Sequence, residues 1–199
     1  MNNLPESIVE ILITQEAIQT RIAEMGKEIA TAYRGSLPLL VGVMKGCVLF
    51  MAELVKNIEI PLEMDFIAIM SYGGMHLSSG AARITKDLDC IIEGRDVLLV
   101  EGIIDTGMTA GYLLRNLEVR QPRSIRVCTL LDKEARRIVK IPISFRGFGI
   151  PDRFVVGYGL DYRQLYRNLP YIGVLSDKMT GLNSGGMPAR PSPNTQGRG

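Results

Sequence analysis

The stretch that decides the fold is VLLVEGIIDTGMT, residues 97–109. Residues 97–100 are apolar throughout, which is typical of a strand buried on both faces of a parallel sheet. Small and polar residues follow at 105–107, and a helical pattern continues from Thr109 to about Leu117. The stretch therefore predicts a strand, a tight turn and a helix, which is the unit from which parallel α/β sheets are built.

Strand-like and helix-like segments alternate along the rest of the chain. Apolar runs typical of buried strands stand at 9–13, 39–43, 62–70 and 125–131, and helical spacing is found at 14–35 and 48–58. This alternation predicts a mainly parallel sheet covered by helices on both sides. Residues 141–171 contain short β-like pieces broken by Pro, Gly and aromatic residues, which is more typical of a hood or a loop-rich flank. We expect one domain over residues 1–180, followed by a disordered tail at 181–199.

Composition and charge are those of an ordinary globular protein. The chain is 46% hydrophobic and 22% charged, with a net charge of +2, which does not suggest a nucleic-acid-binding surface. Its 3 cysteines have no metal-ligand or redox spacing, so a reducing compartment fits them. No apolar run approaches the roughly 18 residues of a membrane span, and the N-terminus lacks a signal-peptide pattern. We expect a cytoplasmic protein that binds neither membranes nor nucleic acids.

Two carboxylates, Glu101 and Asp105, stand at the end of the predicted strand. Ligands of open α/β sheets bind beyond the carboxyl ends of the strands, where Glu101 can accept hydrogen bonds from sugar hydroxyls. The small residues and N–H groups at 106–109 suit a phosphate. Met108 replaces the lysine of the nucleoside-triphosphate loop, and the glycine spacing of that loop is absent. On local chemistry alone, Asp105 and Thr106 fit helix capping equally well.

The same stretch resembles the phosphoribosyl-diphosphate motif of type I phosphoribosyltransferases. The resemblance narrows to hypoxanthine-guanine phosphoribosyltransferases because further segments stand in that family's order over roughly residues 8–176. These segments are VGVMKG at 41–46, DF at 65–66, SYG at 71–73, LLDK at 130–133, IPDRFVVGYGLDY at 150–162 and YRNLPY at 166–171. The resemblance implies a type I phosphoribosyltransferase fold, a mainly parallel sheet flanked by helices, with a small hood region and a mobile lid loop.

The activity that the resemblance implies is purine salvage. The phosphoribosyl group of phosphoribosyl diphosphate would pass to N9 of hypoxanthine or guanine, giving IMP or GMP and pyrophosphate. Asp105 is similar to the general base that faces purine N7. The residues similar to the family's 5′-phosphate contacts are Thr106, Gly107, Met108 and Thr109. Lys133 would donate to the purine 6-oxo group, Phe154 would stack on the purine, and the Val155 backbone would contact the base edge. Taken singly, a lysine such as Lys133 is more often a surface residue, and a phenylalanine such as Phe154 is more commonly a core residue of a strand.

The resemblance also implies contacts for pyrophosphate and for Mg²⁺. The residues similar to the pyrophosphate contacts are Lys45, Gly46 and Arg167, and the family has a cis peptide at Met44–Lys45. Asp161 is similar to a magnesium ligand, and Glu101 would meet the magnesium-bound ribose. Mg²⁺ fits such a site because it binds few carboxylates and otherwise phosphate oxygens and water.

The polar segment at 71–80 resembles a mobile lid. Ser71 and Tyr72 would close over the reacting centre and exclude water, although the segment also fits an ordinary hairpin tip. His76, the single histidine, lies within it and is expected to be a surface residue. The family commonly forms homodimers and homotetramers, and we carry this assembly over as an expectation.

One residue departs from the family pattern. The family has two adjacent acidic residues at the end of the motif strand, whereas here Glu101 is followed by Gly102. One charge-assisted contact contributes roughly 1.5 to 3 kcal/mol, so weaker substrate binding is predicted and Gly102→Asp is expected to raise activity. The departure leaves a second hypothesis open, a low-activity or non-catalytic regulator that binds phosphoribosyl diphosphate or nucleotide. Retention of Asp105 and Lys133 favours the enzyme.

Overall fold

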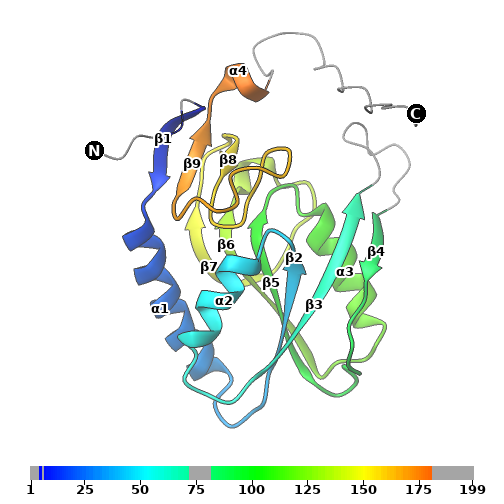
Figure 1. The fold of residues 1–199 in the computed structure, drawn as a ribbon. Coiled ribbons are helices and arrows are strands. Elements are labelled where there is room, and N and C mark those ends of the chain that lie inside the picture. The colour runs from blue at the N-terminus through cyan, green and yellow to red at the C-terminus, as the bar shows by residue number, and fades with distance from the viewer. Residues whose placement is uncertain (1–4, 6, 72–81, 181–199) are drawn as a thin grey trace, which may run out of the picture.

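A larger and a smaller sheet make up the structure, a computed structural model that describes residues 5, 7–71 and 82–180. The larger sheet has six strands in the order β4-β3-β2-β5-β6-β7 (Figure 1). These strands are β2 (Leu39–Met44), β3 (Glu63–Ser71), β4 (Ala82–Lys86), β5 (Asp96–Ile104), β6 (Ser124–Asp132) and β7 (Ile143–Gly149).

Five of the six strands of the larger sheet run parallel. Only the edge strand β4 is antiparallel, to β3. The predicted mainly parallel sheet is therefore confirmed. Because parallel strands end at one edge of a sheet, the carboxyl ends of β2, β5 and β6 lie side by side, where ligands bind in open α/β sheets.

Helices cover both faces of the larger sheet (Figure 1). They are α1 (Gln15–Ala32), α2 (Val48–Lys56) and α3 (Met108–Glu118). Leu98 and Val100 of β5 belong to the core that includes buried residues of α1 and α2, whereas Val97 and Leu99 belong to the core beneath α3. The strand is apolar along its whole central run because side chains on both of its faces are buried.

The start of α1 follows the sequence pattern. The hydroxyl of Thr14 accepts a hydrogen bond from the Ala17 N–H at 3.3 Å and so caps the helix. The residues spaced to face the sheet, Ile18, Ile22, Met25 and Ile29, are fully buried. This helix therefore forms as the periodicity predicts.

The smaller sheet joins strands that lie far apart in the sequence. It consists, in the order β1-β9-β8, of β1 (Ile8–Ile13), β9 (Ile172–Leu175) and β8 (Val155–Val156). The interpretation of residues 141–171 as one loop-rich hood is wrong in part. Residues 143–149 form β7, because they pair with β6 and bury Phe145 in the main core.

A single buried cluster connects the two sheets. Ile13 and Ile172 of the smaller sheet belong to the same cluster as Leu98 and Leu130 of the larger one. Cys47 and Cys128 are also buried there, as free thiols. The smaller sheet is therefore held to the larger one by apolar packing.

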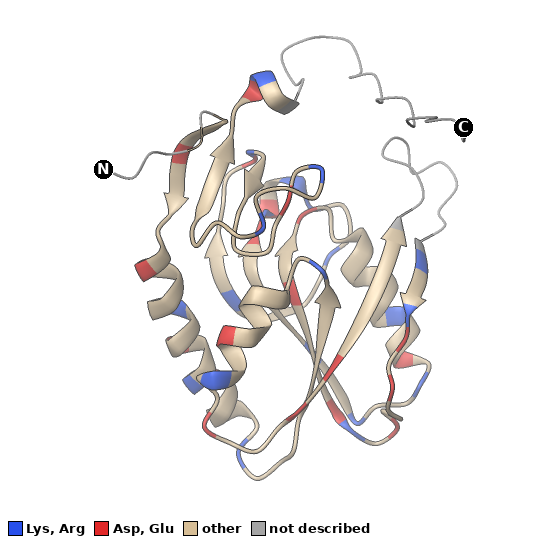
Figure 2. Ribbon diagram, in the orientation of Figure 1, with Lys and Arg blue, Asp and Glu red and all other residues tan. Residues whose placement is uncertain are grey.

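Two short elements complete the described part, the 3₁₀ helix η1 (Glu134–Arg136) and α4 (Asp177–Thr180). The predicted lid, including Tyr72 and His76, lies outside the described residues apart from the backbone of Ser71, and so does the tail at 181–199. Among the helices that the structure describes, none combines the length and the apolarity needed to cross a membrane. Figure 2 shows positively and negatively charged residues interspersed along the ribbon.

Candidate functional site

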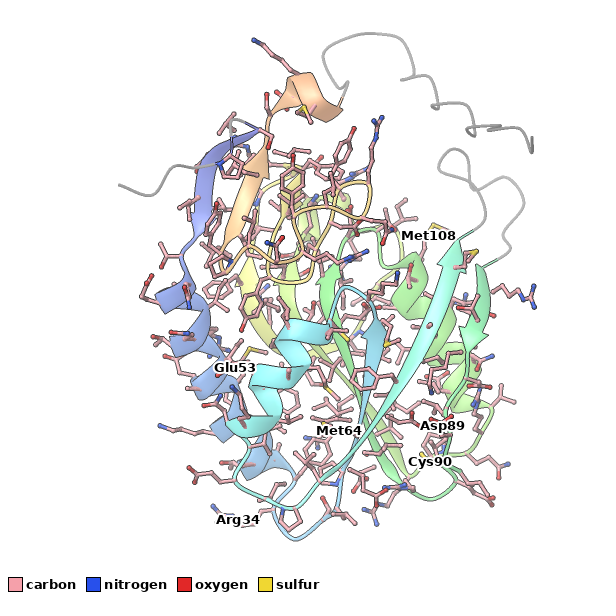
Figure 3. The ribbon with its side chains drawn as sticks, in the orientation of Figure 1. Arg34, Glu53, Met64, Asp89, Cys90 and Met108 are labelled. Carbon is pink, nitrogen blue, oxygen red and sulfur yellow. The ribbon has the colours of Figure 1, made fainter. Side chains whose placement is uncertain are left out.

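Three neighbouring strand ends carry the residues predicted to form the site. Lys45 and Gly46 follow β2, Asp105 follows β5, and Lys133 follows β6. These strands are adjacent in the sheet, so their carboxyl ends meet. Met108 marks this end of α3 in Figure 3, whereas Arg34 lies at the opposite end of the molecule. The residues after β2, β5 and β6 therefore line one edge of the sheet.

A first cleft, here called the β5 cleft, opens between the end of β5 and the start of α3. Its volume is about 220 Å³. The residues that line it are Glu101, Ile103, Ile104, Asp105, Thr106, Gly107, Thr109 and Ala110. The first N–H groups of a helix have no partners within the helix. The N-cap residue of α3 is Gly107, which has no side chain to accept hydrogen bonds from them. To the described side chains, these N–H groups donate one hydrogen bond, a long one of 3.4 Å from the Met108 N–H to Thr106 Oγ1.

The helix start in the β5 cleft is therefore available to an anion. Asp105 does not cap α3, so the capping interpretation of Asp105 is wrong. Backbone N–H groups at the positive end of a helix dipole form a ready anion site. This arrangement differs from α1, whose first turn is served by Thr14.

Gly107 is required by its surroundings. Its backbone is left-handed, with φ at 82°, and a Cβ atom there would collide with the carbonyl oxygen of Val139. Any other residue would be strained at this φ and would push the 137–139 segment away. The glycine thus lets the turn and this segment pack together.

Glu101 is a buried carboxylate without a partner. Its side chain lines the β5 cleft, the residue is 8% exposed, and no described residue forms a hydrogen bond or ion pair with it. Burial raises the pKa of Glu101 to about 8. In the free protein this carboxyl is therefore protonated over most of the neutral range, ready to ionise when a polar or cationic ligand enters.

Glu101 is expected to make the stability of the free protein depend on pH. Because its folded pKa, about 8, exceeds the reference value of 4.5, the folded state binds the extra proton between these values and stability falls as pH rises through them. The fall is at most about 5 kcal/mol. The Glu101→Gln variant is neutral here at every pH, so its stability should depend less on pH. At pH 9 it should be more stable than the wild type. Urea unfolding at pH 5, 7 and 9 measures it.

Glu118→Gln is the matched control for that measurement. Glu118 is exposed on α3 and should leave the pH dependence as in the wild type. If Glu101→Gln lost stability with rising pH as steeply as the wild type does, burial of Glu101 would not be the cause.

The Asp105 carboxylate faces two cations on one side only. Its Oδ2 lies 3.5 Å from Arg136 Nη1 and 3.8 Å from Lys133 Nζ. Its Oδ1 is buried and has no hydrogen-bond partner. A buried acceptor without a partner is costly, and such atoms are uncommon outside functional sites. Asp105 therefore retains an acceptor that no described residue uses.

Lys133 is buried, so its interpretation as a surface lysine is wrong. It is 5% exposed, and its Nζ donates to the Arg153 carbonyl at 2.9 Å. Asp105 and Asp152 each approach Nζ only to 3.8 Å. An ammonium has three N–H donors, so two remain for a ligand. Arg136 and Asp152 pair with each other and with these residues. Arg136 had no signal in the sequence, and Asp152 stood in the quoted segment at 150–162 without an assigned role.

A second cleft, the β6 cleft, lies beside Lys133 and measures about 380 Å³. Its lining residues are Lys133, Arg136, Asp152, Arg153, Phe154 and Asp177. Phe154 is 37% exposed and meets the Tyr162 ring edge to face at 5.6 Å, so it is not a core residue. Val155 is buried in β8 next to it. An exposed aromatic ring beside buried donors suits a flat polar ring.

A third cleft, the β2 cleft, is the largest of these three at about 530 Å³. The polar residues among those that line it are Lys45, Thr85, Asp161, Gln164 and Arg167. Arg167 Nη2 lies 2.7 Å from Asp161 Oδ1, and its Nη1 donates to the Gly159 carbonyl at 2.7 Å. The Met44–Lys45 peptide is cis, as predicted. Glu101 and Asp161 line different clefts.

Three glycines pack tightly between the β5 and β2 clefts. A Cβ atom at Gly102 would lie 2.7 Å from the Gly46 carbonyl oxygen, and one at Gly159 would collide with the same oxygen. The Gly46 carbonyl thus sits in a space that exists because both neighbours lack side chains. Gly102 therefore lets β5 pack against the Gly46 carbonyl, in addition to lacking the carboxylate that the family has at this position.

Comparison with known proteins agrees with this geometry. The family described as "Phosphoribosyl transferase domain" matches residues 9–163. The hypoxanthine-guanine phosphoribosyltransferase of Bacillus subtilis is 49% identical over 172 residues, which are 86% of this chain and 96% of that protein. The crystal structure of a hypoxanthine phosphoribosyltransferase from Staphylococcus aureus superposes with a TM-score of 0.83 at 44% identity, covering 87% of this chain and 94% of that one. A structure of Trypanosoma cruzi hypoxanthine phosphoribosyl transferase gives 0.85 at 38% identity, covering 90% and 97%.

Proposed function

The chain belongs to the phosphoribosyltransferase family, and we propose that it transfers the 5-phosphoribosyl group of phosphoribosyl diphosphate to N9 of hypoxanthine or guanine. The products are IMP or GMP and pyrophosphate, so the reaction is one of purine salvage. The observation that carries the proposal is the Asp105 carboxylate, which lines the β5 cleft. Its Oδ1 is buried without a partner, and its Oδ2 lies 3.8 Å from Nζ of the buried Lys133, which lines the β6 cleft.

The β5 cleft suits the 5′-phosphate. Its donors would be the hydroxyls and backbone N–H groups of Thr106, Gly107, Met108 and Thr109. The uncapped start of α3 supports this assignment, because phosphate is stabilised at the positive end of a helix. Glu101, in the same cleft, would accept hydrogen bonds from ribose hydroxyls.

The β6 cleft suits the purine. Phe154 would stack on the ring, and the Val155 backbone would contact its edge. Lys133 would donate to the 6-oxo group, and an adenine amino group at that position would oppose a donor with a donor. Asp105 would accept the proton that leaves the purine ring as the bond from N9 to the ribose forms.

The β2 cleft suits pyrophosphate. Lys45, Gly46 and Arg167 would bind it as the bond from the ribose C1 to the diphosphate breaks. Arg167 now pairs with Asp161 at 2.7 Å, and a bound diphosphate would compete for the guanidinium. Ser71 and Tyr72 would close over the reacting centre and exclude water.

Magnesium fits the same cleft. Asp161 is the only carboxylate among the described residues that line it, and no three His, Cys, Asp or Glu side chains of the described part form a metal cluster. This suits Mg²⁺, which binds one or two carboxylates and otherwise phosphate oxygens and water. Asp161 would hold it from this cleft, and Glu101, which lines the β5 cleft, would meet it through the ribose that the metal binds. When bound, the metal neutralises charge on the departing diphosphate.

A second copy of this chain is the partner we propose, in a homodimer or homotetramer. Exposed apolar side chains support it: Val48 and Leu49 on α2, and Met64 and Met70 on β3. Met64, Phe66 and Met70 share one face of β3, because alternate residues of a strand point to the same side. Phe66 packs against the core on the α2 side, so the two methionines lie on the same side as Val48 and Leu49. Sedimentation velocity measures the assembly, and a monomer at micromolar concentration would contradict it.

The runner-up function, a regulator without turnover, has less support. A regulator needs neither a base beside the purine nor a buried lysine to select a 6-oxo group, and both are built here at a cost in desolvation. The charges of the two signs are interspersed along the chain, which gives no support to a nucleic-acid partner (Figure 2).

One assay tests the function. The protein is incubated with magnesium, phosphoribosyl diphosphate and one of hypoxanthine, guanine, xanthine or adenine, and nucleotide formation is followed by absorbance. We expect turnover with hypoxanthine and guanine and little with adenine. Absence of nucleotide with every base would overturn the proposal.

Gly102 variants separate packing from charge. Gly102→Ala should lower kcat/KM for phosphoribosyl diphosphate about tenfold, because its Cβ displaces the Gly46 carbonyl at a cost of about 1–3 kcal/mol. Gly102→Asp adds the same atom but also a carboxylate that contributes roughly 1.5 to 3 kcal/mol. The Asp variant should therefore exceed the Ala variant at least tenfold and lie close to wild type. Steady-state kinetics in varied phosphoribosyl diphosphate measure both.

The sequence-based expectation for Gly102→Asp considered the carboxylate alone. The contact of the new Cβ atom with the Gly46 carbonyl has a cost of similar size, which opposes the gain from the carboxylate. Equal activities of the Ala and Asp variants would show that a carboxylate at this position does not reach the substrate.

A further inference from the structure

Arg137 connects the ends of β5 and β6 from outside the three clefts proposed to bind substrate. It follows η1, and its side chain is only 14% exposed. Its guanidinium faces the end of β5 and Asp132, the last residue of β6, which is 4% exposed. Neither residue lines a cleft assigned above to phosphate, purine or pyrophosphate.

The guanidinium holds the backbone that carries Asp105. Its Nε donates to the Asp105 carbonyl at 3.0 Å, and its Nη2 donates to the Ile104 carbonyl at 3.3 Å and pairs with Asp132 Oδ1. A planar guanidinium with fixed donors constrains its acceptors in direction as well as distance. Three acceptors from two strand ends are thus held by one buried side chain.

We propose that Arg137, held by Asp132, is a positioning residue that fixes the Asp105 carboxylate relative to Lys133. The inference rests on the proposed function, in which Asp105 takes the purine proton and Lys133 meets the 6-oxo group. The Lys133 N–H donates to the Ile104 carbonyl at 2.9 Å, the same oxygen that Arg137 contacts. The backbones of the base and of the purine-recognising lysine therefore share one anchoring point.

The residues after Arg137 support the same turn. The N–H groups of Ile138 and Val139 both donate to the Thr106 carbonyl at 2.9 Å. Gly107 packs so closely here that a Cβ atom would lie 2.9 Å from Arg137 Cδ and would collide with the Val139 carbonyl. The 137–139 segment thus backs the whole turn at 105–107, and Arg137 is its charged end.

Asp132 has a second arginine partner, which provides a matched control. Arg146 Nη1 lies 3.3 Å from Asp132 Oδ2, but its side chain is 54% exposed and forms no hydrogen bond with the backbone of the turn. Its other carboxylate neighbour is Glu134, at 4.0 Å. Arg137→Gln and Arg146→Gln each remove one cation from Asp132, and only the first removes the hold on Asp105.

The experiment compares these variants in the nucleotide-forming assay. Displacing a reacting group by about 1 Å lowers a rate by about 100-fold, so Arg137→Gln should lower kcat by that factor while KM for hypoxanthine changes by less than about threefold. Arg146→Gln should stay within about threefold of wild type. Arg137→Lys keeps the charge but not the planar donors, so it should recover only part of the loss. Thermal unfolding of each variant identifies any that is not folded at the assay temperature.

A double-mutant cycle decides whether Arg137 acts through Asp105. If it does, Arg137→Gln should cost less than about threefold in an Asp105→Asn background, because the group it positions is already gone. An equal loss in both backgrounds, or equal losses for Arg137→Gln and Arg146→Gln in folded proteins, would overturn the inference. An inactive wild type would instead overturn the proposed function.

Discussion

Asp105→Asn is expected to lower kcat by about 100- to 10,000-fold with hypoxanthine or guanine, the range for loss of a positioned general base. The amide is nearly isosteric, but it cannot take a proton from the purine. Asp105 Oδ1 has no partner in the free protein, and Oδ2 is 3.5 Å or more from its nearest cations, so the carboxylate is not consumed by internal hydrogen bonds. KM for phosphoribosyl diphosphate should change little, since we propose that the phosphate binds at the start of α3 and not at the Asp105 side chain.

Asp152→Asn is the control for Asp105→Asn. Asp152 also lies 3.8 Å from Lys133 Nζ and 3.8 Å from Arg136 Nε, but it is 55% exposed. Its loss removes a negative charge from the same two cations and should cost less than about tenfold, as surface ion pairs do. Similar losses in the two variants would mean that Asp105 acts as a counter-ion and not as the base.

Lys133→Met is expected to lower kcat/KM for hypoxanthine and guanine by about 1,000-fold and to leave adenine at its low wild-type rate. Sites that hydrogen-bond a substrate group reject analogues without it by about 10⁴- to 10⁵-fold, and most of that discrimination is lost with the donor. Met fills the buried volume without N–H groups. It also leaves the Arg153 carbonyl without its 2.9 Å donor, so some loss of stability accompanies the change.

The ratio of hypoxanthine activity to adenine activity tests the role of Lys133. A general loss of structure would lower both activities and leave their ratio unchanged. Arg136→Gln is its control. Arg136 borders the same cleft and pairs with the same carboxylates but is 49% exposed, and its loss should preserve the ratio. An unchanged ratio in Lys133→Met would show that selection of the 6-oxo group lies elsewhere.

Most of the fold is predictable from the sequence because its signals are local. The apolar run at 97–100 and the spacing of Ile18, Ile22 and Met25 reflect burial that each segment experiences by itself. The placement of residues 143–149 was missed because Gly and aromatic residues broke the strand pattern, and only pairing with β6 determines that they join the larger sheet. Local pattern does not report which strands become neighbours.

The candidate site is predictable in its residues but not in its contacts. The turn at 105–109 has a local pattern, and the family resemblance supplied Lys133 and Phe154. Nothing in the sequence marked Arg137, and Asp152 stood in the quoted segment at 150–162 without an assigned role. The importance of both arises from distances to Asp105 and Lys133 across the fold. The packing of Gly102 against the Gly46 carbonyl was equally invisible, because these residues approach only when β2 and β5 pair.

The smaller sheet has a consequence for the order in which a ribosome-bound chain can acquire its binding sites. The residues that line the β5 cleft, and the 137–139 segment that backs its turn, all precede residue 140. Phe154, by contrast, is held by β9, whose Leu175 N–H donates to the Phe154 carbonyl at 2.9 Å. β9 pairs in turn with β1, the first strand to be synthesised. A nascent or truncated chain that ends before residue 172 therefore contains the residues of the anion-binding turn but lacks the strand that holds Phe154 beside Lys133. The proposed stacking of the purine on Phe154 thus depends on the last strand of the described part of the chain.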